Sequence, residues 1–178
     1  MFPIIAGSDT TANAINMTVS YIASNPEVAT KLRNEIQSAI SEGKISSPVT
    51  NEEAIQLPYL QAVIWEGLRI HPPFGGLIMK QVGAEGDMFD GKFIPPGTRI
   101  GHSTWAVTHE VSVFGADVSV FRPERWLEAN ENMKATMRRQ TELVFGSGRW
   151  GCPGKVVAFI ELNKVMVEVN YDSSPNSQ

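Results

Sequence analysis

A lone cysteine in a glycine-rich segment is the residue of this 178-residue chain best suited to chemistry. Cys152 lies in Phe145-Gly-Ser-Gly-Arg-Trp-Gly-Cys-Pro-Gly154, and an apolar helical pattern follows directly. Because the chain has no second cysteine, an internal disulfide and a multi-cysteine zinc or iron–sulfur centre are excluded. A functional sulfur must therefore act alone, and axial ligation of haem iron is one task that a lone thiolate performs.

The backbone around Cys152 suits a flat bound group. Glycines leave the loop without side chains, so it can approach a ring system such as a porphyrin closely. The free N–H groups of the next helical turn, those near Gly154 among them, favour a thiolate. Phe145 can pack beside the sulfur and shield it from water. The alternative is a buried and inert cysteine, because most lone cysteines are of that kind.

The order of residues resembles the haem-binding loop of the cytochrome P450 family, Phe-x-x-Gly-x-Arg/His-x-Cys-x-Gly. The matching positions are Phe145, Gly148, Cys152 and Gly154. Trp150 stands where the family has the Arg or His that contacts a haem propionate, and Arg149 precedes it. The resemblance implies a haem b cofactor held by the matching residues and Arg149, with Cys152 as the axial ligand of the iron.

A second segment of the same family lies near the start of the chain, in Ala6-Gly-Ser-Asp-Thr-Thr11. Gly7 inside a helix costs about 1 kcal/mol relative to alanine, which indicates that something needs the space. Thr10 can bond to a carbonyl one turn earlier. The resemblance implies that this helix crosses the distal haem face, that Asp9 and Thr10 deliver protons to dioxygen, and that Ala6 and Gly7 make room for it. Without the resemblance, a solvated helix face or a cap is the simpler reading.

Two further segments supply a charged network. Glu66 and Arg69 are three residues apart in a predicted helix, so their side chains share a face. In the family, this pair is joined by a downstream arginine, and Phe121-Arg-Pro-Glu-Arg-Trp126 places Arg125 at that position. A guanidinium fork suits bidentate pairing with a buried carboxylate. We expect a structural network that fixes the loop under the haem, without a catalytic role.

The segment after Pro73 is expected to line a substrate pocket. The resemblance implies that a strand passes the haem edge here, which makes Phe74, Leu77 and Ile78 pocket candidates; ordinary core packing explains them equally well. No polar residue among them points to a specific substrate group. The three histidines show no spacing typical of a metal site, so we expect structural or surface roles for them.

The composition bounds the remaining classes of function. A net charge of −4 argues against a general nucleic-acid binder. No run of about 18 apolar residues and no basic region followed by an apolar segment occurs, which predicts neither a membrane span nor a signal peptide. The chain shows no dinucleotide or phosphate-loop fingerprint. A single cysteine fits a reducing compartment without establishing one, and members of the family are often associated with the endoplasmic-reticulum membrane, so the localisation stays open.

The apolar patterns predict a mainly α fold with a small mixed β-sheet, part of a P450-like fold. Helices are expected near 3–23, 26–41, 51–56, 58–70 and 153–169, strands near 77–82, 92–94 and 98–102, and an irregular stretch from 109 to 151. Val156, Phe159, Ile160 and Val167 are expected to form the apolar face of the last helix. Helix starts are indicated by Asn25 as a cap before Pro26 and by a capping box at Thr50.

One domain-like unit is expected over residues 1–170, followed by a polar, disordered tail over 171–178. The resemblance implies that the N-terminal half of the family fold, with its membrane anchor and much of its pocket, is absent. It also implies a haem-thiolate monooxygenase that inserts one atom of dioxygen into an apolar small molecule, with electrons from an NADPH-dependent reductase. The alternatives are a truncated, non-catalytic remnant and a haem-binding module that needs a partner chain.

Overall fold

Helices dominate the computed structural model, which describes residues 2–172. The longer ones are α1 (Phe2–Ala23), α2 (Pro26–Ser41), α4 (Pro58–Ile70), α8 (Glu131–Thr141) and α9 (Lys155–Asp172). The short ones are α3 (Asn51–Ala54), α5 (Thr104–Thr108), α6 (Val111–Phe114) and α7 (Arg125–Glu128). The mainly helical fold is confirmed, and the predicted helices correspond to α1, α2, α3, α4 and α9.

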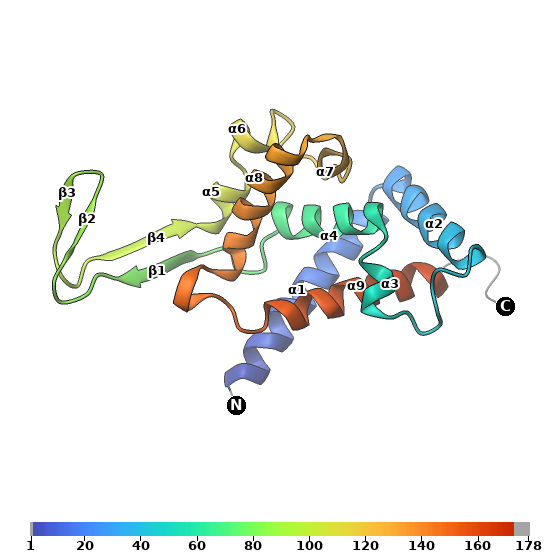
Figure 1. Cartoon of the computed structure of the whole chain (residues 1–178), viewed down its shortest axis with the longest axis horizontal. Helices are drawn as coiled ribbons and strands as arrows, with labels where there is room; N and C mark the ends of the chain where they lie inside the picture. The colour runs from blue at the N-terminus through green and yellow to red at the C-terminus, as the bar shows by residue number, and fades with distance from the viewer. Residues whose placement is uncertain (1, 173–178) are drawn as a thin grey trace.

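The strands form two small sheets. Strand β1 (Leu77–Gln81) pairs with β4 (Arg99–Ser103), and β2 (Asp87–Phe89) pairs with β3 (Lys92–Ile94). In Figure 1, β1 and β4 make a ribbon that leads away from the helices and carries the β2–β3 hairpin at its far end. The predicted strands are present, and their pairings in the described part of the chain are antiparallel rather than mixed. Strand β2 is exposed along its length. Its sequence therefore lacks the alternation of apolar and polar residues from which a strand is predicted.

The prediction of an irregular stretch from 109 to 151 is wrong. It contains α6, α7, α8 and two 3₁₀ turns, Glu142–Phe145 and Gly148–Trp150. Helices α6 and α7 have four residues each, which is too short for a helical period to show. Helix α8 is mostly polar, and Met137 is its buried apolar residue, so its sequence lacks an apolar stripe.

Capping explains where two helices begin. The Thr50 hydroxyl accepts the Glu53 N–H at 3.3 Å and the Glu53 carboxylate accepts the Thr50 N–H at 2.8 Å, so the predicted capping box is confirmed. The bond from the Thr50 N–H, and after it a bond from the Ser46 hydroxyl to the same carboxylate, hold the pKa of Glu53 down to about 2. Pro26 stands at the start of α2 as expected. The predicted Asn25 cap is wrong, because the Asn25 amide donates to the Tyr21 carbonyl of the preceding helix instead.

The main core lies where α1, α2, α4 and α9 pack together, as Figure 1 shows. Leu32, Leu60, Ile64 and Met166 are almost fully buried in it. The predicted buried face of α9 is correct for Val167 only: Val156 is 69% exposed, Ile160 is 37% exposed and Phe159 is half-buried. In the first half of that face, Phe159 packs against Trp65 and Phe145 while Val156 and Ile160 stay exposed, and periodicity alone does not reveal which positions have a neighbour.

The last two residues of α9 belong to the segment predicted as a polar tail, and the rest of that segment lies outside the described residues. Across residues 2–172, no helix is both long and apolar enough to cross a lipid bilayer.

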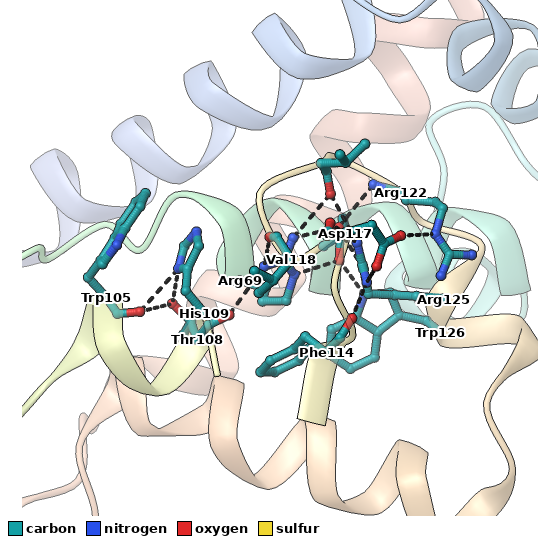
Figure 2. A network of polar contacts seen from close by, with 12 residues as sticks. Arg69, Trp105, Thr108, His109, Phe114, Asp117, Val118, Arg122, Arg125 and Trp126 are labelled. Carbon is teal, nitrogen blue, oxygen red and sulfur yellow. Dashed lines mark hydrogen bonds and ion pairs between the residues drawn. The ribbon is translucent and has the colours of Figure 1, made fainter. Parts of the chain in front are cut away.

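The carboxylate of Glu66 on α4 lies at the centre of a buried polar network, part of which Figure 2 shows. One oxygen, Oε1, accepts from Arg69 Nη2 at 2.8 Å and from Arg125 Nε and the Arg122 N–H at 3.0 Å. The other, Oε2, accepts from Arg69 Nε at 2.9 Å and from Trp126 Nε1 at 2.8 Å. The structure therefore brings together the three residues that the motifs single out, Glu66, Arg69 and Arg125.

The two guanidinium groups extend this network to backbone carbonyls. Arg69 Nη1 donates to the Val118 carbonyl at 2.7 Å and to the Thr108 carbonyl at 3.2 Å. Arg125 Nη2 donates to the carbonyls of Asp117 and Val120 at 3.0 Å. Because the side chains of Glu66 and Arg69 are fully buried and that of Arg125 is 3% exposed, these bonds replace lost hydration. The segment between α5 and α7 is thereby fixed against α4.

Glu66→Gln is expected to lower the free energy of unfolding by about 3–5 kcal/mol, because buried Arg69 loses its counter-charge and buried Arg125 keeps only the partly exposed carboxylate of Asp117. Chemical denaturation followed by circular dichroism measures this. Glu85→Gln, on an exposed turn, is the matched control and should change stability by less than about 0.5 kcal/mol. A loss below about 1 kcal/mol for Glu66→Gln would contradict a buried, charged network.

Because of His109, we expect the free energy of unfolding to depend on pH. Burial of its ring, and then the charge of Arg69, lower the pKa of His109 below its ordinary value of 6.5. The unfolded chain then binds a proton where the folded chain does not, so the unfolding free energy falls as the pH drops below about 6.5. His109→Gln should remove this part of the slope, measured by denaturation at a series of pH values. Equal slopes for both proteins would show that His109 does not contribute.

Candidate functional site

A cavity of about 370 Å³ lies between α1, the loop before β1 and the Cys152 segment. Its wall carries Ala6, Gly7, Thr10, Thr11, Ala14, Leu68, Pro73, Phe74, Ile78, Val144, Phe145, Gly146, Trp150, Cys152, Pro153, Gly154, Ala158 and Leu162. No acidic or basic side chain is among them. The cavity is thus apolar, with hydroxyl groups on one side and one thiol on the other.

Helix α1 contributes one face to the cavity. Ala6, Gly7 and Thr10 have the three- and four-residue spacing that places side chains on the same side of a helix. The Thr10 hydroxyl donates to the Ala6 carbonyl at 2.7 Å. A Cβ added to Gly7 would meet no atom within 4 Å, so the glycine leaves open space at the wall. Asp9 is exposed and does not line the cavity, because it projects from another side of the helix.

The Cys152 segment forms the opposite wall. The Cys152 N–H donates to the Phe145 carbonyl at 2.7 Å, which closes the loop on itself. Gly146 allows this closure: its φ is +74°, and a Cβ there would come within 2.9 Å of the Trp150 carbonyl oxygen. The Phe145 ring packs against Phe159 in a tilted arrangement, with ring centroids 5.7 Å apart. Cys152 is free and exposed, so the expected shielding of its sulfur from water is not seen in this structure.

The other motif residues of this segment lie away from the cavity. Gly148 and Arg149 do not line it, although Trp150 does. The Arg149 guanidinium lies 4.6 Å from the centre of the Trp150 ring, and both side chains are exposed. Close to them, Lys80 Nζ donates to the Ser147 carbonyl at 3.1 Å and to its hydroxyl at 3.2 Å. Two cationic side chains, Lys80 and Arg149, thus lie at the Cys152 segment without lining the cavity.

Of the three residues predicted to line the substrate pocket, two line the cavity and one does not. Phe74 and Ile78 line the cavity, whereas Leu77 does not and is 55% exposed. Successive residues of a strand point to opposite faces, so Leu77 and Ile78 cannot both face the same cavity.

The histidines take no part in the cavity. His102 Nε2 lies 3.3 Å from the Leu143 carbonyl oxygen, and the His109 ring stacks on Trp105 (Figure 2). His71 ends α4. In the part of the chain that the structure describes, no group of three or more His, Cys, Asp or Glu side chains could hold a metal ion.

These residues fit a haem. A flat apolar macrocycle suits an uncharged wall, one sulfur is available for an axial bond, and the propionates could meet Lys80 or Arg149 at the rim. Cys152 would hold the iron through its sulfur, and the open space at Gly7 would leave room for the group at the α1 wall.

Several residues that line the cavity were not predicted from the sequence. Thr11 and Ala14 continue the face of Ala6 and Thr10, so helical spacing could have found them. Leu68, Ala158 and Leu162 lie on α4 and α9 and look like ordinary core residues in the sequence. Only the packing of these helices against α1 places them beside the cavity.

Comparison with known proteins gives relatives over almost the whole chain. The cytochrome P450 monooxygenase ABA1 of Pyricularia oryzae is 53% identical over 167 residues, 93% of this chain and 33% of that protein. The cytochrome P450 monooxygenase aba1 of Botryotinia fuckeliana is 46% identical over 169 residues, 95% of this chain and 33% of its own. A pisatin demethylase of Fusarium vanettenii is 39% identical over 173 residues, 96% and 32% of the two proteins. The chain spans about one third of the length of these curated relatives.

The description of the family agrees with the arrangement of the motifs. The Cytochrome P450 family matches residues 3–169, a range that includes α1, the Glu66 network and the Cys152 segment. The match and the level of identity settle the affiliation: the chain belongs to the cytochrome P450 family.

Proposed function

We propose that the protein is a haem-thiolate monooxygenase that inserts one oxygen atom of dioxygen into an apolar organic substrate and reduces the other to water. The family implies a haem cofactor. The observation that carries the proposal is the shared cavity: Cys152 lines the same apolar cavity as Gly7 and Thr10, which lie at the opposite end of the sequence. A sulfur ligand and a hydroxyl thus face the same space from opposite sides.

The cofactor in this proposal is haem b, and it supplies the activation of dioxygen when bound. Cys152 would hold its iron through the sulfur, Phe145, Gly148, Arg149 and Gly154 would be the loop residues that accommodate it, and Ala6 and Gly7 would leave room for it on the α1 side. A Cβ added at Gly154 would lie 3.7 Å from the Cys152 sulfur, an ordinary van der Waals distance, so this glycine lies directly beside the sulfur. Low wall polarity favours burial of the macrocycle.

Asp9 and Thr10 are the proposed proton-handling residues. The Thr10 hydroxyl lines the cavity and donates to the Ala6 carbonyl at 2.7 Å, and by rotating it could donate its proton to an acceptor inside the cavity. The Asp9 carboxylate, at the preceding position of the helix, is exposed to water. Thr10 is thus the inner and Asp9 the outer end of the transfer.

Electrons would come from NADPH through a separate reductase that docks beside the Cys152 segment. Arg139, Glu142, Cys152 and Lys155 border a second hollow on this side of the loop. Lys155 is paired with Glu142 at 2.8 Å, so Arg139 and the exposed Arg149 carry the positive charge of this side. Positive groups favour an acidic partner surface and speed its encounter.

The substrate would be an apolar small molecule, since Phe74 and Ile78 offer only apolar contact. The names of the relatives differ, ABA1 in one and pisatin demethylase in another, and do not define a common substrate.

A second candidate is a non-catalytic remnant, or a haem-binding module that needs a partner chain. It is favoured by the exposure of cavity residues: Phe74 is 52% and Trp150 is 61% exposed. Another chain that covered them would complete the wall and remove apolar surface from water.

The first test is a carbon-monoxide difference spectrum of the haem-reconstituted, dithionite-reduced chain. We expect a long-wavelength, thiolate-type Soret band, and we expect Cys152→Ala to abolish it because the axial sulfur is lost. Ser147→Ala, in the same loop, is the control and should retain the band.

A wild-type chain without that band would sink the monooxygenase proposal for this chain. A band without substrate oxidation, with reductase and NADPH supplied, would favour the haem-binding module. Recovery of oxidation on addition of a complementary chain would identify the missing wall as the reason.

Gly7→Leu separates folding from cofactor binding. Removing a helix-interior glycine should raise the free energy of unfolding by about 0.5–1 kcal/mol. The leucine side chain would fill the space beside the proposed haem, so haem affinity in a spectroscopic titration should fall at least about tenfold, the range of a lost or displaced apolar contact. Ala12→Leu, on an exposed face of α1 away from the cavity, is the control and should leave affinity unchanged. Unchanged affinity in Gly7→Leu would place the haem elsewhere.

A further inference from the structure

A row of aromatic rings connects the Glu66 network with the Cys152 segment. Trp126 lies 5.7 Å from Trp65, Trp65 lies 5.1 Å from Phe159, and Phe159 lies 5.7 Å from Phe145, measured between ring centroids. Each pair is tilted, an arrangement that aromatic rings favour. Only Phe145 belongs to the motifs of the proposed haem site.

The residues at the two ends of the row are hydrogen-bonded to Glu66 and to Cys152. At one end, Trp126 Nε1 donates to Glu66 Oε2 at 2.8 Å, so its ring is held by the buried carboxylate. At the other end, the Phe145 carbonyl accepts the Cys152 N–H at 2.7 Å. A shift of Phe145 would therefore be passed directly to the backbone of Cys152.

Trp65 is the member of the row that joins two separate parts of the core. It packs against the smaller cluster of buried residues, which includes Phe114, Trp126 and Met137. Phe145 and Phe159 pack against the larger cluster instead. The Trp65–Phe159 contact therefore links the two clusters, and the Arg138 guanidinium lies 5.8 Å from the Trp65 ring on its other contact surface.

The Cys152 loop itself has few anchors. Residues 147–153 are exposed, and glycines at 146, 148 and 151 leave the backbone without side-chain packing. Apart from the bonds of Lys80 to Ser147, the packed ring of Phe145 is the principal tether of the loop to the body of the protein. The geometry of the sulfur then depends on what holds Phe145 in place.

We propose that Trp65 is a positioning residue for the Cys152 sulfur, acting through Phe159 and Phe145. The inference rests on the proposed function, because it takes the sulfur as the haem ligand. Trp65 contacts neither the cavity nor the loop, so its effect would be indirect.

The test compares Trp65→Leu, which removes the ring, with Trp65→Phe, which keeps one. In the haem-reconstituted, carbon-monoxide-bound chain, Trp65→Leu should lower the ratio of the thiolate-type band to the shorter-wavelength band by about two- to tenfold, the effect of losing one aromatic pair. Trp65→Phe should restore most of the ratio. Trp105→Leu is the matched control, since Trp105 is 53% exposed and stacks on His109 outside the row.

A second measurement needs no haem. Hydrogen exchange of the Cys152 amide, whose partner is the Phe145 carbonyl, should be about two- to tenfold faster in Trp65→Leu than in the wild type and unchanged in Trp105→Leu. This arm still tests Trp65 if the wild type shows no thiolate-type band, an outcome that would defeat the proposed function alone.

Two results would overturn the positioning role. One is a Trp65→Leu chain that is less stable yet keeps the wild-type band ratio and Cys152 exchange rate, because a merely structural residue would act on folding only. The other is a Trp65→Phe chain as impaired as Trp65→Leu, because then the ring contact is not what matters.

Discussion

The rest of this structure depends on the burial of one carboxylate. Glu66 accepts from Arg69, Arg125, Trp126 and the backbone of Arg122, and its side chain is completely removed from water. A buried charge is tolerated only when its hydrogen-bonding capacity is filled. Removal of any one of these donors is therefore expected to destabilise the fold. The guanidinium groups pass the constraint to the carbonyls of the segment between α5 and α7, which has little regular structure of its own.

The cavity is built on the helices that this constraint fixes. Helix α4 carries Glu66 and also packs against α1 and α9, whose residues form two of the cavity walls. The glycines give the Cys152 segment its close turn at Gly146, and they also remove most of its packing. The aromatic contacts of Phe145 compensate for that loss by attaching the segment to the core. Rigidity of the proposed ligand therefore comes from residues outside its own loop.

The long helices could be predicted from the sequence because apolar residues recur along them at helical spacing, as in α2 and α4. The helices between 109 and 151 could not, because α6 and α7 are single turns and α8 is mostly polar. Likewise, Val156 and Ile160 follow an apolar period on α9 without being buried. Periodicity shows which residues share a face, whereas burial requires a neighbour that lies far away in the sequence.

The sequence by itself determined the family, through the order of its motifs, and the identity of the single available sulfur, because no other cysteine exists. It also determined that Glu66 and Arg69 can pair, since their spacing is local. Tertiary structure alone decided which motif residues face the cavity: Thr10 does and Asp9 does not, Ile78 does and Leu77 does not. The reason is physical: neighbouring residues point in different directions from a helix or strand, and only the packing of distant elements determines which of those directions leads into the cavity.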